Sequence, residues 1–319
     1  MVSLHKKPNL KMDLATKVFL YLLYCAFRVL YHCIQSFNWW IYGTSYKLKT
    51  NRRNYNLSAQ VCDVMWKYKL DKLEQPPSRL EFVYTHQKFV DPEYVLQDHV
   101  TLYYVTSSEA IFVETDPGID VTKSSTNCFL RAAQYDHAER LIILPMSSFQ
   151  ALAAEVGDPV AKVIILTNTG RCGSTLVTQI FENTGRCVCL SEPPFFNFPV
   201  EYGDTLSQKE VDGIMLSCLR LQCKPRKDKD VDAFLLKTKG QHTQFAPMYA
   251  RIYKHCKLLY MYRNGLKTTE SFFRVSQTLE MPRVANFIDG FIPIRNKLMG
   301  VKLHPDVKKL DGTTFWLYV

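Results

Sequence analysis

The second half of this 319-residue sequence predicts an α/β fold in which helices cover both faces of a parallel sheet. Three observations favour this fold class. From Lys162 onward, short apolar runs alternate with segments of helical periodicity. The runs are continuously apolar, as in strands that are buried on both faces. Polar residues follow several runs, at the carboxyl ends of strands where such folds bind ligands. A small α+β module and an N-terminal membrane-associated helix are predicted to precede this sheet.

Residues 1–17 predict a basic N-terminal tail. Residues 1–53 contain nine lysine and arginine side chains and one acidic residue, Asp13, so most of the net charge of +10 lies there. A basic segment beside an apolar stretch suits the anionic surface of a membrane. No nucleic acid is expected as a partner, because neither a zinc-ligand spacing nor an interleaving of basic with aromatic residues occurs.

Residues 18–43 predict a membrane anchor or an interfacial helix. The stretch from Val18 to Ile34 is apolar for ten residues and is then interrupted by Arg28 and His32. Its seventeen residues are the short end of a membrane span, and Arg28 near the middle would cost about 2.5 to 3.5 kcal/mol in a bilayer. A polar stripe on one helical face favours a helix in the interface. The stripe consists of Lys17, Tyr21, Tyr24, Arg28, His32 and Gln35. A signal anchor is the first prediction, an interfacial helix the second, and a buried helix the third.

Residues 54–158 predict an accessory α+β module that packs or binds a partner. Its β-branched and aromatic runs predict strands, and two helical segments follow them. The predicted strands are 79–86, 99–106 and 109–115, and the predicted helices are 129–141 and 147–157.

Residues 159–319 predict the domain with the parallel sheet. The predicted strands are 162–167, 187–191, 233–238 and 257–262, and the predicted helices are 174–183, 208–222, 243–256 and 266–275.

The first predicted strand of this domain ends in a loop suited to an anion. Gly170 and Gly173 let the chain turn tightly, so that backbone N–H groups and the positive end of the next helix can converge on one anion. Ser174 and Thr175 add hydroxyl donors, and Arg171 adds a charge. The loop lacks the lysine of a Walker motif, which weighs against hydrolysis of ATP or GTP.

A second anion-binding element follows the last predicted strand. Arg263 lies at the end of that strand and Ser271 lies eight residues later, inside the next predicted helix. An arginine can form a bidentate contact with a phosphate and a serine hydroxyl can donate to the same group. Two such elements in one α/β chain predict a ligand with two separated anionic groups.

These motifs resemble those of the sulfotransferase family, whose members transfer a sulfuryl group from 3′-phosphoadenosine 5′-phosphosulfate (PAPS). The R-x-G-S-[ST] segment at 171–175 is similar to the 5′-phosphosulfate loop of Golgi carbohydrate sulfotransferases, and the Arg-x7-Ser pair is similar to the family's 3′-phosphate site. "LSEPPFF" at 190–196 is similar to the family's Glu-Pro segment. The resemblance covers roughly 162–275 and implies a P-loop NTPase-like fold. The implied PAPS-binding residues are Arg171, Cys172, Gly173, Ser174, Thr175, Arg263 and Ser271.

Sulfuryl transfer also needs a base that accepts the proton of the acceptor. Glu192, at the carboxyl end of a predicted strand, is the first candidate, and His242 is the second. Cytosolic relatives carry a Lys-Thr-His tripeptide where this chain has Lys237-Thr238-Lys239. Only 48 residues follow Ser271, fewer than the family's closing segments require, which predicts a truncated C-terminal part or an inactive relative.

The sequence therefore predicts a single-pass type II Golgi protein that transfers a sulfuryl group from PAPS to a hydroxyl or amine of a glycan or another lumenal acceptor. No metal is expected, because none of the ten cysteines forms a CxxC pair. Two alternatives remain: a P-loop kinase or NTPase, and a catalytically inactive membrane-associated relative.

Overall fold

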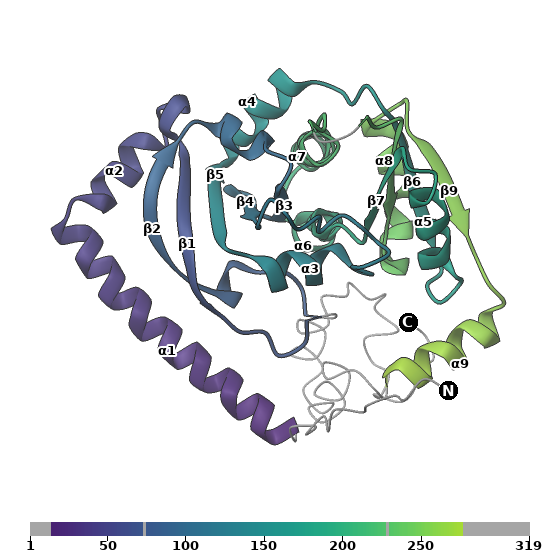
Figure 1. Cartoon of the computed structure of the whole chain (residues 1–319), viewed down its shortest axis with the longest axis horizontal. Helices are drawn as coiled ribbons and strands as arrows, with labels where there is room; N and C mark the ends of the chain where they lie inside the picture. The colour runs from purple at the N-terminus through teal and green to yellow at the C-terminus, as the bar shows by residue number, and fades with distance from the viewer. Residues whose placement is uncertain (1–13, 73–74, 228–229, 277–319) are drawn as a thin grey trace.

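The computed structural model of this chain describes residues 14–72, 75–227 and 230–276. Two sheets and the helices around them make up the described part (Figure 1). Most of the predicted basic tail and the segment after Ser276, where a truncation was predicted, lie outside the described residues.

The first sheet is antiparallel, with the strand order β2-β1-β5-β4-β3. Its strands are β1 (Ala59–Lys67), β2 (Phe82–Val90), β3 (Val100–Val105), β4 (Glu109–Glu114) and β5 (Arg140–Pro145), and its helices are α3 (Leu130–His137) and α4 (Met146–Val156). The predicted helix 129–141 is too long: it ends at His137, and Arg140 begins β5. The strand takes this segment because its apolar run is buried at the middle of the sheet, between β1 and β4.

The second sheet is parallel, with the strand order β7-β8-β6-β9, as the alternating pattern predicts. Its strands are β6 (Lys162–Asn168), β7 (Cys187–Ser191), β8 (Ala233–Lys237) and β9 (Lys257–Met261). Its helices are α5 (Ser174–Glu182), α6 (Phe198–Tyr202), α7 (Gln208–Gln222), α8 (Ala246–Ile252) and α9 (Gly265–Ser276). Short 3-10 turns are η1 (Tyr55–Leu57), η2 (Arg79–Glu81), η3 (Pro92–Leu96), η4 (Pro194–Asn197) and η5 (Gly240–Phe245).

Successive strand residues point to opposite faces of the parallel sheet. Because the strands are continuously apolar, both faces are apolar, and helices cover both. Leu166 and Leu235 pack on one face with Val177 and Phe181 of α5. Neighbouring residues such as Ile165 belong to the core on the other face, with α7 and α8. That core also contains residues of the antiparallel sheet, so one apolar core joins the two sheets.

The N-terminal helix α1 (Leu14–Ile41) lies outside the antiparallel sheet, and α2 (Thr44–Asn51) follows it (Figure 1). α1 is long and apolar enough to cross a membrane, by length and composition alone, and its most apolar window has a mean hydropathy of 1.4. The ordinary buried helix that the sequence left open does not fit, because most of α1 is exposed.

Candidate functional site

The loop between β6 and α5 has the backbone conformation of an anion-binding loop. Gly170, Arg171 and Gly173 have φ values of 73°, 51° and 91°. A positive φ is unusual for a residue with a side chain and turns successive N–H groups toward one point. No side chain caps the first turn of α5 among the described residues, so its N-terminal N–H groups and the positive end of its dipole face this loop.

Neighbouring strands and helices hold the loop in place. The buried amide of Asn168 accepts from the Gly170 N–H at 2.8 Å and donates to the Thr238 carbonyl at 2.7 Å. Gly170 also packs closely against α9, because a Cβ added there would lie 2.4 Å from the Phe272 ring. The loop is therefore held on both sides, by Asn168 and by α9.

The two anion elements predicted from sequence come together. Arg171 Nε donates to Ser271 Oγ at 3.0 Å, although 100 residues separate them. Arg263 Nη1 donates to the Arg171 carbonyl at 3.1 Å. The pairing of β6 with β9 causes this meeting, since it brings their carboxyl ends to one edge of the sheet. Both arginines are exposed to solvent.

Lys237 supplies a positive charge beside the loop, and the sequence analysis did not assign it a role. This lysine ends β8, and its Nζ lies 3.2 Å from Thr175 Oγ1 and 3.2 Å from Glu192 Oε1. Its side chain is buried, with the ammonium 5.1 Å from the centre of the Phe129 ring. A polar residue at the carboxyl end of a buried strand was the signal that could have identified it.

Glu192 follows β7 and lies between two cations. Its carboxylate is 3.2 Å from Lys237 Nζ and 3.4 Å from Arg131 Nη1, which comes from α3 of the antiparallel part. Burial raises the pKa of Glu192, but the charges of Arg131, Lys237 and Lys239 outweigh burial and bring the pKa below its ordinary value. The carboxylate is therefore ionised, and in this arrangement it is a weak base.

His242, the second candidate base, is buried within η5. Its Nε2 lies 2.9 Å from Asn197 Oδ1, and its Nδ1 has no hydrogen-bond partner among the described residues. Burial, assisted by the positive charge of Lys239, lowers the pKa of His242 to about 3. The imidazole is neutral at physiological pH, and a base with so low a pKa accepts a proton poorly.

The remaining predicted loop residues support the loop's shape. Cys172 is partly buried, Gly173 precedes the first turn of α5, and Ser174 is buried within that turn. All ten cysteines are free thiols. The described residues contain no group of three or more His, Cys, Asp or Glu side chains that could hold a metal ion.

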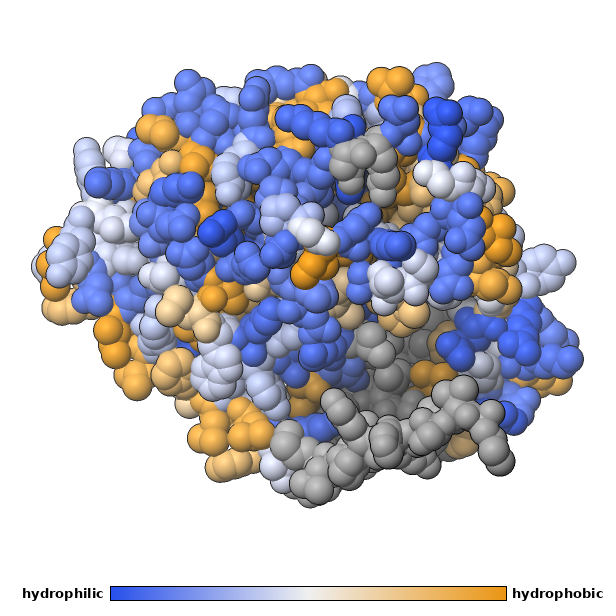
Figure 2. Space-filling model, in the orientation of Figure 1, coloured by the Kyte–Doolittle hydropathy of each residue, from blue (hydrophilic) through white to orange (hydrophobic). Residues whose placement is uncertain are grey.

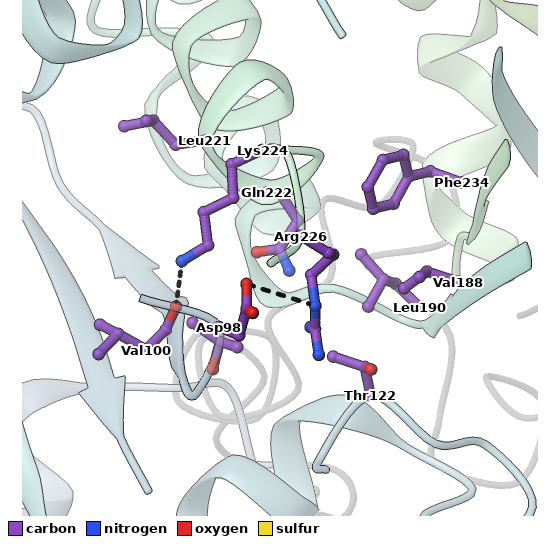
Figure 3. Close-up of a pocket in the computed structure, with 11 residues that line it drawn as sticks. Asp98, Val100, Thr122, Val188, Leu190, Leu221, Gln222, Lys224, Arg226 and Phe234 are labelled. Atoms are coloured by element: carbon purple, nitrogen blue, oxygen red, sulfur yellow. Dashed lines mark hydrogen bonds and ion pairs between the residues drawn. The ribbon is translucent and has the colours of Figure 1, made fainter. Parts of the chain in front are cut away.

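Two cavities lie away from this loop, around Arg226. The smaller, of about 10 Å³, could hold no more than a water molecule. Beside it, Lys224 Nζ donates to the carbonyls of Val95, Gln97 and Val100 at 2.5 to 2.8 Å, and Arg226 faces Asp98 (Figure 3). A buried lysine often marks a catalytic site, but here three carbonyls accept from its three donors, so its role is structural. The larger cavity, of about 350 Å³, is also bordered by Asp98 and Arg226.

No protein-family model, curated protein or solved structure matches this chain.

Proposed function

We propose that this chain is a PAPS-dependent sulfotransferase that modifies a hydroxyl or amine of a glycan or another lumenal acceptor. One observation carries the proposal: Arg171 and Ser271, from two separate anion-binding elements, lie within hydrogen-bond distance at one sheet edge. A nucleotide with phosphate groups at both its 5′ and 3′ positions is a ligand that requires two such elements side by side. The proposal includes the Golgi membrane as the protein's location, because the loop motif resembles that of Golgi carbohydrate sulfotransferases.

The residues present fit such a donor. The uncapped first turn of α5, Thr175 and Lys237 surround the loop, and they suit a phosphosulfate group. Arg263 and Ser271 suit a 3′-phosphate. Lys237 provides the ammonium that the loop itself lacks. PAPS, when bound, supplies the sulfuryl group, and the chain's cations neutralise the charge that grows on the leaving phosphate.

The same lysine helps to set the strength of the proposed base. Burial raises the pKa of Glu192, whereas Arg131, Lys237 and Lys239 together lower it. An anion that attracts the Lys237 ammonium weakens this pairing, so the pKa of Glu192 rises toward the value that burial favours. Glu192 would then be a stronger proton acceptor while Lys237 engages the anion, with Arg131 still beside its carboxylate. His242 remains the alternative base.

A thermal-shift titration with the product nucleotide adenosine 3′,5′-bisphosphate tests the proposal. A concentration a hundredfold above Kd should stabilise the wild-type chain by about 2.7 kcal/mol. Arg171→Ala and Arg263→Ala should each reduce the stabilisation at that concentration. Arg186→Ala is the matched control, because Arg186 pairs with Asp232 on the surface and contacts neither anion element. An unchanged melting temperature at saturating nucleotide contradicts the proposal.

Two further measurements separate the alternatives. Stabilisation by Mg-ATP in preference to adenosine 3′,5′-bisphosphate would identify a kinase or NTPase. Nucleotide binding without transfer from PAPS to a panel of glycan acceptors would identify an inactive relative. Transfer that requires Glu192 but tolerates His242→Gln would assign the base.

A further inference from the structure

The polar stripe of α1 faces the protein. Two of its side chains bond to the open edge of the antiparallel sheet, and a third bonds to the turn just before that edge. Arg28 Nε donates to the Phe82 carbonyl at 3.3 Å and Gln35 Nε2 to the Tyr84 carbonyl at 2.6 Å, whereas Tyr24 Oη donates to the Leu80 carbonyl of η2 at 3.3 Å. β2 is the end strand of its sheet, so the Phe82 and Tyr84 carbonyls lie on an edge that no neighbouring strand pairs with.

Aromatic contacts extend this attachment along the helix. Tyr24 and Phe27 each pack edge-on against Trp66 of β1, with ring centres 5.3 Å apart. Farther along, the Trp39 ring lies 6.2 Å from that of His86. α1 is thus held against the sheet over several turns by the face that carries its polar residues.

The opposite face of α1 is apolar and exposed. Leu22 and Phe37 are each 60% exposed and Trp40 is 72% exposed. The exposed apolar residues of this face recur at helical spacing along the whole helix: Phe19, Leu22, Leu23, Val29, Leu30, Ile34, Phe37, Trp40 and Ile41. Hydrophobic residues gather along the lower-left edge of the molecule, where α1 runs (Figure 2). This outer stripe is longer than the scattered apolar residues that an ordinary soluble surface carries.

A transmembrane α1 would break this arrangement. A spanning helix would have to leave the sheet, expose the β2 edge, and carry Arg28, His32 and Gln35 into hydrocarbon. Arg28 and Gln35 would each lose a backbone partner on the sheet where replacement by water is impossible. A helix that lies along the surface keeps all of these bonds while its outer stripe enters the lipid.

Positive charge beside the outer stripe favours a lipid surface as the partner that covers it. α2 follows α1 after Gly43 and presents exposed Lys47 and Lys49, and Arg53 is exposed just beyond it. Basic residues beside an apolar helical face are attracted to anionic headgroups. Trp40 and Tyr42 lie at the end of the stripe, as aromatic residues do at a membrane interface. A second copy of this chain would present the same positive charge and gain nothing from it.

We infer that α1 lies flat in the surface of an anionic lipid bilayer, with its outer stripe in the acyl region and its polar stripe on the sheet. This geometry holds on either side of a cellular membrane and does not depend on the proposed transferase activity.

Flotation of the purified full chain with vesicles tests the binding surface. The chain should bind vesicles of phosphatidylcholine with about a third phosphatidylserine, and bind pure phosphatidylcholine less. The double variant Leu22→Glu, Leu30→Glu should bind at least about tenfold more weakly, with an unchanged melting temperature. Leu57→Glu is the matched control, since Leu57 is an exposed leucine outside α1. Equal binding by the double variant and the control would overturn the inference.

Depth measurements distinguish a flat helix from a spanning one. Spin labels introduced through a genetically encoded amino acid at Phe19, Leu30 and Ile41 should all lie at one shallow depth, about 5 to 10 Å into the boundary region. A maximum depth at Leu30 with shallow ends would show a span and overturn the inference. A lipid-independent dimer in sedimentation, with loss of vesicle binding, would assign the outer stripe to a second copy instead.

Discussion

The ammonium of Lys237 lies 3.2 Å from the hydroxyl of Thr175, although the two residues come from different elements and are 62 positions apart. This contact places a positive charge at an anion loop that lacks the usual lysine. Lys237→Met should therefore weaken binding of adenosine 3′,5′-bisphosphate by about ten- to a hundredfold. This is the change in Kd that corresponds to the loss of one hydrogen bond to a charged group. Calorimetric titration measures the change.

Lys162→Met is the control for that variant, because Lys162 is an exposed lysine at the opposite end of β6. The control should bind like the wild-type chain. Equal affinity of Lys237→Met and Lys162→Met would remove Lys237 from the proposed donor site.

The Lys237–Glu192 pair should also show a large coupling in stability. Both side chains are mostly buried, so removing either one leaves an incompletely compensated charge and should cost about 3 kcal/mol or more of the free energy of unfolding. Lys237→Met combined with Glu192→Gln should cost less than the sum of the single changes, since neither charge remains. Urea unfolding of the four proteins gives the coupling energy. Additive costs would indicate that the two groups do not interact.

Gly170→Ala should destabilise the anion loop. A β-carbon at this position would lie 2.4 Å from the Phe272 ring, and the backbone φ of 73° is unfavourable for alanine. We expect a loss of about 1 to 3 kcal/mol in thermal unfolding. Gly185→Ala separates the two causes, because its φ is 81° but a β-carbon there meets no atom within 4 Å. A larger loss at Gly170 than at Gly185 measures the contact with α9, and equal losses would show that only backbone conformation matters.

The strands of the parallel sheet were predictable because each is a short, continuous apolar run between turn residues. β1 and β5 were not predicted, although they lie at the centre of the other sheet. Arg140 and the residues before it continue the helical pattern of α3, and only pairing with β1 and β4 decides that a strand begins there. Local propensity is a weak prior when tertiary pairing buries a segment.

In the candidate site, too, some residues were predictable from the sequence and others depend on tertiary packing. Arg171, Arg263 and Ser271 were identified from spacing, because the order of strands and helices places them at one edge of the sheet. Arg131 was not, since its approach to Glu192 depends on how α3 packs against the parallel sheet. The polar stripe of α1 was also evident in the sequence, but periodicity does not reveal whether such a stripe faces headgroups, water or the edge of a sheet.

His242 should make the stability of the folded chain depend on pH below neutrality. Its pKa is about 3 in the folded protein and about 6.5 in an unfolded chain, so acidification protonates the unfolded state first. The stability contributed by the neutral imidazole is complete above about pH 6.5 and is lost as the pH falls toward 3. Within this window the wild-type chain should lose about 1.4 kcal/mol per pH unit more than His242→Gln, which has no proton to take up.

Urea unfolding between pH 6 and about pH 4 measures the two slopes, and comparing slopes removes any constant cost of the substitution itself. His255→Gln is the control for the substitution of an exposed histidine. If His242→Gln and the wild-type chain have the same slope, the folded protein takes up a proton at this imidazole as readily as the unfolded chain does, and the case for His242 as the alternative base becomes stronger.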